Sequence, residues 1–193
     1  MATKNLENRS ARERLLAAAD ELFYEEGVHT VGIDRVIERA GVAKATLYNA
    51  FGSKDGLIRA YLTARHAVTR DRTTSALATR YETPRERLLG VFDVLCEMAA
   101  EPGFRGCAFI NASAESLAGG VVEEVSDEAR AWLHSLFVEL AREAGAPDPA
   151  LLARQLMLLY DGASVGARMD RDPRIANAAR AVAMVLLDVA STA

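Results

Sequence analysis

Apolar residues recur along the chain at the three-to-four-residue spacing of amphipathic helices. Leu15, Ala19 and Leu22 repeat in this way, and Gly27 marks the end of that segment. The same spacing, with glycine, proline or a capping residue at the ends, predicts further helices at about 33–40, 44–51, 54–80, 84–100, 107–117, 121–144, 148–168 and 173–187. No segment alternates apolar and polar residues as a half-buried strand does. The pattern therefore predicts an all-α protein of about nine helices.

The two short helices predicted at 33–40 and 44–51 are separated by Gly41, which tolerates the left-handed backbone of a sharp turn. In the second helix, Leu47 and Phe51 fall on the side that faces the core. The other side carries short or polar residues suited to the edges of DNA bases, together with residues that reach phosphates: Lys44, Ala45, Thr46, Tyr48 and Asn49. An ordinary buried helical hairpin is the alternative interpretation.

Lys54 stands at the start of the next predicted helix, directly after Ser53, a residue type that caps helices. A lysine charge and the free backbone N–H groups of a helix N-terminus can hold one phosphate together. Gly56, in the first turn, is expected to weaken the start of this helix. Lys54 is therefore a candidate phosphate contact.

Composition and charge exclude several classes of protein. Hydrophobic residues make up 50% of the chain and charged residues 26%, which excludes a disordered or low-complexity protein. The longest apolar run, 181–187, is too short to span a membrane, and the polar N-terminal sequence predicts no signal peptide. Two cysteines, Cys96 and Cys107, fit neither a metal site nor a disulfide framework, so we expect a cytoplasmic protein without metal or cofactor.

The net charge of −4 is distributed unevenly between the N-terminal third of the chain and the rest. Residues 1–65 hold 10 basic and 9 acidic side chains, or +1, and residues 66–193 hold 13 and 18, or −5. An acidic protein can still bind DNA when its cations gather on one face, but an ordinary mixed-charge surface fits these numbers too.

Residues 41–57, GVAKATLYNAFGSKDGL, resemble the second half of the DNA-binding domain of TetR/AcrR-family transcriptional regulators, and 22–27 resemble its first helix. The resemblance implies a helix-turn-helix DNA-binding domain at 9–69, with the motif at 32–51, and a ligand-binding and dimerisation domain at 70–193. It also implies a homodimer on a palindromic operator in double-stranded DNA, most often a repressor released by a small-molecule effector. The family's DNA-contacting positions correspond here to Gly32, Lys44, Ala45, Thr46, Tyr48, Asn49 and Lys54.

Two positions depart from the family's usual residues. Gly32 and Ala43 stand where many members have serine or threonine at the start of the two motif helices. Each departure removes a side-chain cap worth about 1 kcal/mol. At Gly32 a phosphate-binding hydroxyl is absent as well, which leaves its backbone N–H as the candidate contact.

The resemblance weakens after residue 70, although GCAFIN at 106–111 and Glu115 resemble a motif in one set of TetR-type bodies. Bulky residues on the predicted helices are candidates to line an effector pocket, with core packing as the alternative for each: Phe92, Cys96, Phe104, Cys107, Phe109, Trp132, Met157 and Tyr160. Cys107, next to Arg105 at a helix start, is either a reactive sensor thiol or a buried structural one.

The last two predicted helices carry the candidate dimer surface. Small residues in the first allow close approach of another helix, and the second is apolar on more than one side, so that one side must be covered by another chain. The candidates are Gly162, Gly166, Ile175, Ala179, Val182, Leu186 and Val189. We expect them to form a four-helix interface with their copies.

A helical enzyme and a helical interaction protein are the rival functions. After residue 65 the chain has only His66 and His134 as histidines, and it has no HExxH, no GxSxG and no paired metal ligands. No enzyme is therefore expected. The sequence leaves open the effector, the operator, the regulated genes and the choice between repression and activation.

Overall fold

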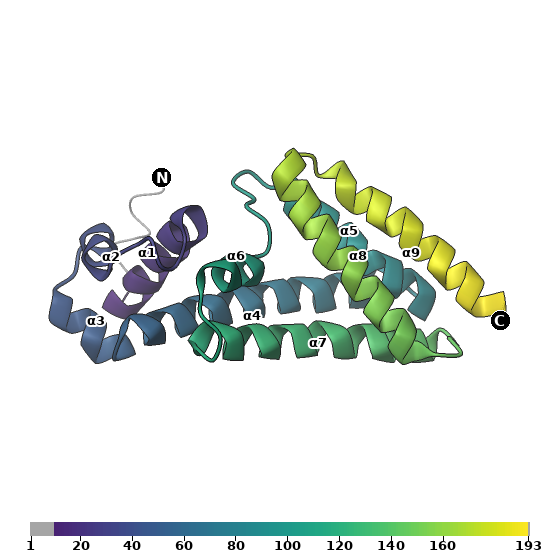
Figure 1. The fold of residues 1–193 in the computed structure, drawn as a ribbon, viewed down its shortest axis with the longest axis horizontal. Coiled ribbons are helices and arrows are strands. Elements are labelled where there is room, and N and C mark those ends of the chain that lie inside the picture. Colours follow the sequence, from purple (N-terminus) through teal and green to yellow (C-terminus); the bar gives the residue numbers. More distant parts are fainter. Residues whose placement is uncertain (1–9, 193) are drawn as a thin grey trace. The chain divides into compact units, whose positions relative to one another are not determined.

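The computed structural model describes residues 10–192, which form nine α-helices and no strand, as the pattern predicted (Figure 1). The expected start of a domain at residue 9 and the N-terminal segment before it lie outside the described residues. None of the described helices is long and apolar enough to cross a membrane. The helices are α1 (Ala11–Glu26), α2 (Ile33–Ala40), α3 (Lys44–Phe51), α4 (Lys54–Arg80), α5 (Pro84–Ala99), α6 (Ala108–Glu115), α7 (Val121–Glu143), α8 (Pro149–Asp170) and α9 (Arg174–Thr192).

The described residues divide into two compact units. The N-terminal unit holds the chain up to His66 and a second segment, 108–127; the C-terminal unit holds 67–107 and the chain from Glu128 onward. Helices α4 and α7 each contribute residues to both units. The sequence did not predict that α6 and the start of α7 group with the first three helices.

The N-terminal unit is built on the apolar face of α1. Helix α1 begins at a capping box, in which the backbone N–H of Glu13 donates to Oγ of Ser10 and the N–H of Ser10 donates to the Glu13 carboxylate. Phe23 from α1 meets Tyr61 from α4 edge to face, with ring centroids 5.6 Å apart. Helices α1, α2 and α3 pack on one another around this core.

The second segment of this unit adds helices to the same core. Ala112 of α6 and Val122 and Val125 of α7 are buried together with the apolar residues of α1 and α4. On the surface, Arg59 of α4 forms an ion pair with Glu124 of α7. The α6 segment is thus an integral part of the N-terminal unit.

The C-terminal unit has its own core, in which α5, α8 and α9 pack on one another (Figure 1). Phe92, Phe137 and Tyr160 form an aromatic cluster with centroid separations of 6.1 to 6.5 Å. Helix α5 begins at a second capping box, between Thr83 and Glu86. The backbone and side-chain hydrogen bonds from Thr83 hold the pKa of Glu86 below its usual range.

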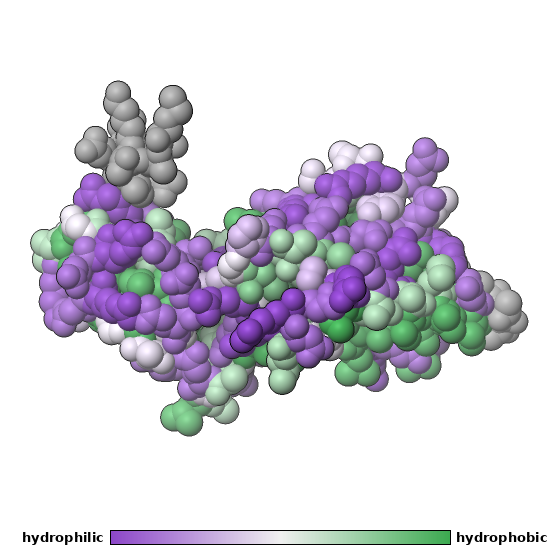
Figure 2. Space-filling model, turned by 90° about the horizontal axis from the view of Figure 1, so that it is seen from above, coloured by the Kyte–Doolittle hydropathy of each residue, from purple (hydrophilic) through white to green (hydrophobic). Residues whose placement is uncertain are grey.

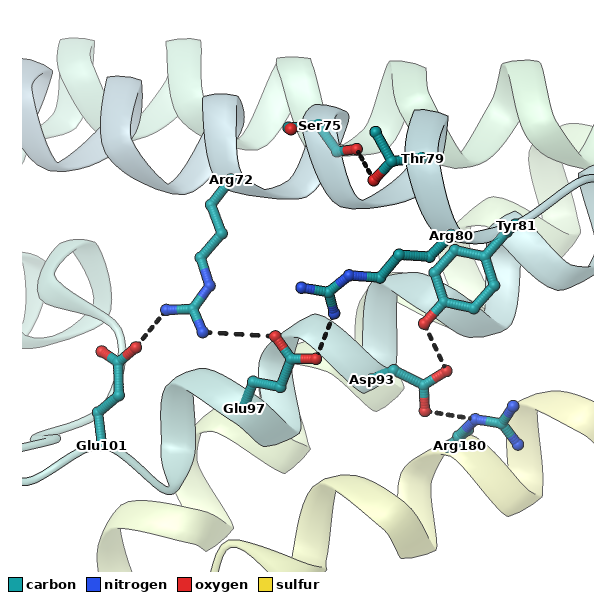
Figure 3. A network of polar contacts seen from close by, with 9 residues as sticks. All are labelled: Arg72, Ser75, Thr79, Arg80, Tyr81, Asp93, Glu97, Glu101 and Arg180. Carbon is teal, nitrogen blue, oxygen red and sulfur yellow. Dashed lines mark hydrogen bonds and ion pairs between the residues drawn. The ribbon is translucent and has the colours of Figure 1, made fainter.

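Ion pairs join α4 to α5 within the C-terminal unit (Figure 3). Arg72 lies between Glu97 and Glu101, and Arg80 also pairs with Glu97. The hydrogen bond to Glu101 raises the pKa of Arg72 above its usual range. Because these side chains are partly exposed to water, each pair contributes little stability by itself.

A second part of this network reaches α9. The Tyr81 hydroxyl donates to Asp93 at 3.0 Å, and the other carboxylate oxygen of Asp93 lies 2.7 Å from Nε of Arg180 (Figure 3). Burial and this hydrogen bond raise the pKa of Tyr81. A Cβ at Gly90 would overlap the Tyr81 ring, so the glycine makes room for it.

Helices α8 and α9 approach each other closely, and two residues expected at a dimer surface take part in this contact. A Cβ at Gly166 would lie 2.9 Å from Cγ2 of Ile175, so these two residues face each other within one chain. Ala179 is buried in the core, and Leu186 packs against it. Small residues thus allow close packing inside the chain, a use that the spacing alone does not distinguish from packing between chains.

Candidate nucleic-acid interface

The turn between α2 and α3 has the geometry of a helix-turn-helix motif. Gly41 adopts a left-handed backbone, with φ 62° and ψ 46°, as predicted from its position. The N–H of Gly41 donates to the carbonyl of Glu38 at 3.1 Å, and the N–H of Val42 donates to that of Ile37 at 3.3 Å. Val42 packs against the core, so the two helices are held at a fixed turn.

Helix α3 is anchored by one side and exposes the other. Leu47 is fully buried, and Phe51 is half-buried against the same core. Ala45 and Asn49 are exposed, and Tyr48 is 44% exposed. The exposed face therefore consists of short or polar side chains plus one tyrosine, which is the composition that suits a helix entering a major groove.

The two motif helices begin without side-chain caps, as the departures from the family pattern predicted. Gly32 precedes α2 and Ala43 precedes α3, and neither makes a capping hydrogen bond. Gly32 has an ordinary extended backbone and open space where a Cβ would lie. The N–H groups in the first turn of α2 consequently have no side-chain acceptor from Gly32 and remain candidates for a phosphate.

Lys44, the first residue of α3, forms an ion pair with Asp34 in the first turn of α2. Its Nζ lies 2.9 Å from Oδ1 of Asp34, and both side chains are largely exposed. The hydrogen bond to Asp34 raises the pKa of Lys44 above its usual range. The sequence analysis did not identify Asp34, which places a negative charge beside a candidate DNA contact.

Lys54, the first residue of α4, has no carboxylate partner among the described residues. Its Nζ donates to the backbone carbonyl of His29 at 3.4 Å. Ser53 caps α4 as predicted, because its Oγ accepts the N–H of Gly56 at 3.0 Å. A Cβ at Gly56 would overlap the carbonyl oxygen of Phe51, so this glycine is required for the tight α3–α4 turn, whereas the sequence suggested only a weakness.

Most other cations of the N-terminal unit are neutralised by neighbouring carboxylates. Arg35 pairs with Glu26, Arg39 with Glu21, and Arg65 with Asp20. Arg12 differs, because its guanidinium lies 5.0 Å from the ring centroid of Phe51 and has no carboxylate partner among the described residues. The exposed Arg12 is thus a further cation beside α3 that the sequence analysis did not identify as a candidate contact.

The candidate effector-pocket residues do not all belong to one unit. Phe109 lies in the N-terminal unit, where its ring meets that of His66 edge to face with centroids 6.3 Å apart; the other seven lie in the C-terminal unit. Phe92 and Met157 are buried, Cys96 donates to the carbonyl of Pro173 at 3.6 Å, and the remaining four are half-buried: Phe104, Cys107, Trp132 and Tyr160. Burial raises the pKa of Tyr160. Among residues 10–192, no three metal-ligating side chains lie close enough to hold a metal ion.

Apolar side chains are exposed on α8 and α9. Figure 2 shows them gathered over the part of the chain near its C-terminal end. Val182 and Val189, both predicted at a dimer surface, are 48% and 62% exposed, and Gly162 is exposed too. The others are Leu151, Leu158, Val165, Met169, Met184 and Val185.

Comparisons with known proteins agree with this arrangement. A family model for bacterial regulatory proteins of the TetR family matches residues 15–61. The solved structure of a TetR-family transcriptional regulator from Streptomyces coelicolor is 34% identical, covers 94% of this chain and 96% of that one, and superposes with a TM-score of 0.88.

Two curated relatives match different lengths of the chain. The transcriptional repressor NemR of Escherichia coli is 27% identical over 83% of this chain and 85% of its own length. The transcriptional activator FasR of Mycolicibacterium smegmatis is 47% identical over 51 residues, which are 26% of this chain and 23% of that protein. With a helix-turn-helix motif and a full-length match to a family member, the chain belongs to the TetR family of DNA-binding transcriptional regulators, and it is not an enzyme.

Proposed function

We propose that this regulator is a homodimeric repressor that leaves its operator when a small molecule binds within residues 70–193. The exposed face of α3 carries the proposal, because it is polar, rests on the buried Leu47 and has a lysine at its start. Ala45, Thr46 and Asn49 contact base edges, and Lys44, Tyr48, Lys54 and the N–H groups at Gly32 contact phosphates. Because its proposed partner is DNA, we expect the protein to act in the cytoplasm.

The proposed dimer uses the exposed apolar side chains of α8 and α9. On α8, Leu151, Leu158 and Val165 recur every seven residues, the spacing of a helix-packing seam. Val182, Val185 and Val189 provide the matching stripe on α9. A second copy offers the same apolar surface, and a two-fold dimer suits a palindromic operator.

The choice of repression rests on the extent of the two curated matches. The relative that aligns along most of its length, NemR, is named a repressor, whereas the activator FasR is matched over 23% of its length. The effector candidates are the bulky residues of the C-terminal unit, from Phe92 to Tyr160. Helix α4 contributes Lys54 to one unit and its later turns to the other, so it is the proposed lever between effector and DNA.

Two duplex-binding measurements test this function. A salt series on duplex DNA should give a steep linear fall of log affinity with log salt, because phosphate contacts release counterions. An absent slope would contradict DNA binding by this surface. In the second measurement, a palindromic site is selected from random-sequence DNA. The dissociation constant of a compound that raises the melting temperature of the wild-type chain is then measured with and without that site.

Release by an effector requires that effector and DNA each weaken the binding of the other. Recognition helices must be about 34–36 Å apart to enter successive major grooves, so an effector that favours another spacing weakens DNA binding. By linkage, the selected site must weaken binding of the compound by the same factor, typically about 5–150-fold. Equal dissociation constants for a compound bound in residues 70–193 would contradict release by that compound.

A further inference from the structure

The end of α6 contacts the turn that joins α1 to α2. Oε2 of Glu115 accepts a hydrogen bond from the backbone N–H of His29 at 3.1 Å, and Nε2 of His29 lies 3.0 Å from Oγ of Ser116. Gly27 lies so close that a Cβ there would overlap the Glu115 carboxylate. These residues all belong to the N-terminal unit.

The same turn leads directly to the candidate phosphate contacts. The carbonyl of His29 accepts the hydrogen bond from Lys54, and the N–H of Val31 donates to the carbonyl of Gly27 at 3.3 Å. Gly32, the residue before α2, follows immediately. The backbone of His29 is therefore held by α6 through its N–H and by α4 through its carbonyl.

An acidic residue at position 115 is unexpected if its only purpose is to stabilise the fold. Its side chain is exposed, and it adds a negative charge to the unit that binds a polyanion, which by itself opposes DNA binding. Glu115 also belongs, with residues 106–111, to the sequence motif that lies outside the helix-turn-helix and has no assigned purpose so far. Helix α6 starts directly after Cys107, the last residue of a segment of the C-terminal unit. Glu115, at the other end of α6, makes the contact with the 27–31 turn.

We propose that Glu115 is a positioning residue for DNA binding. By holding the backbone of His29, Glu115 fixes the 27–31 turn, and the turn places Lys54 and the start of α2 for the phosphate backbone. Gly27 is the residue that lets the carboxylate approach, since any side chain there would displace it. The inference rests on the proposed phosphate contact of Lys54 and does not require an effector.

The test compares Glu115→Ala and Glu115→Gln with a matched control, Glu123→Ala, in the full chain. Glu123 lies in the same 108–127 segment, and its carboxylate also accepts a backbone hydrogen bond, from Gly119, without touching the 27–31 turn. Each alanine variant thus removes one negative charge and one hydrogen bond of the same kind. The measurements are affinity for generic duplex DNA at low salt and amide hydrogen exchange of residues 27–31.

Glu115→Ala should bind duplex about 10-fold more weakly than Glu123→Ala and exchange the amides of 27–31 about 10-fold faster, the effect of one lost charge-assisted hydrogen bond. Glu115→Gln should keep most of the wild-type duplex affinity and most of the protection of the 27–31 amides, because its amide oxygen can still accept the hydrogen bond from His29. Equal affinity and exchange in the two alanine variants would overturn the proposal, as would faster exchange with unchanged affinity or a glutamine variant as weak as alanine. If the wild-type chain bound no duplex, DNA binding itself would fail, whereas the exchange data would still report on the contact.

Discussion

Helices α3 and α9 each bury one side and expose the other, but the exposed sides differ in chemistry. Helix α3 exposes Ala45, Tyr48 and Asn49, with a lysine at its first position. Helix α9 exposes Val182, Val185 and Val189. A polar face keeps its hydration until a charged partner replaces the water, whereas each of these half-exposed valines gains roughly 1 kcal/mol when its remaining surface is buried. The two faces are thus suited to DNA and to a second apolar surface, respectively.

The two helices also differ in how they are anchored. Helix α3 has one fully buried side chain, Leu47, whereas α9 buries three alanines and a leucine at close range: Ala176, Ala179, Ala183 and Leu187. Because Leu47 is the one fully buried side chain of α3, we expect the position of this helix to be sensitive to its substitution. The distributed contact of α9 tolerates changes on its exposed side without loss of the fold. The predictions below follow from this difference.

Leu47→Ala should give the largest effect. Removing a fully buried leucine side chain leaves a cavity beneath α3 and should lower the free energy of unfolding by about 2–5 kcal/mol. Urea denaturation monitored by circular dichroism measures the loss. The neighbouring Thr46→Ala should change stability by less than about 1 kcal/mol, because Thr46 is only half-buried. Equal losses in the two variants would show that Leu47 is not the anchor of α3.

Val182→Glu combined with Val189→Glu should break the proposed dimer while each chain stays folded. Two acidic side chains in an apolar interface should raise the dimer dissociation constant by at least about 100-fold, which sedimentation velocity can measure. Asn177→Glu is the control for an added acid on this helix, since it places one negative charge, against two in the double variant, at an exposed polar position of α9. A dimer as tight as the wild type would mean that this stripe is not the interface.

The sequence predicted the helices because their signals are local. Gly41 has the left-handed backbone expected between α2 and α3, and Ser53 caps α4 as its residue type suggests. Contacts between distant segments carry no such signal. The spacing made Gly166 and Ile175 candidates for a contact between chains and gave no sign that they pack together within one chain, and the hydrogen bond between Glu115 and His29 joins residues 86 positions apart. The exposed face of α3, which carries the candidate site residues, was predictable for the same reason, whereas the neighbouring charges of Asp34 and Arg12 were not identified from the sequence.

Lys54→Ala tests the polar side of the comparison with a smaller effect. If Lys54 contacts a phosphate, its removal should lower the magnitude of the salt slope by about two per dimer, one for each subunit, with equal weakening on all sequences. Arg59→Ala is the matched control, because Arg59 is on the same helix but is already paired with Glu124. A slope unchanged from the wild type would remove Lys54 from the interface.

Asp34→Asn should give the smallest effect and in the opposite direction. Asp34 holds Lys44 in an exposed ion pair, which contributes little stability, and its charge is repelled by nearby phosphates. Removing the charge frees Lys44 for DNA, so affinity for duplex should rise about two- to five-fold. Glu38→Gln neutralises an acid one turn further along α2 that does not pair with Lys44, and it should raise affinity less. Fluorescence anisotropy with labelled duplex at fixed salt measures both variants. Weaker binding by Asp34→Asn would instead mean that Asp34 orients Lys44 toward the DNA, and the pair would then belong to the reading surface.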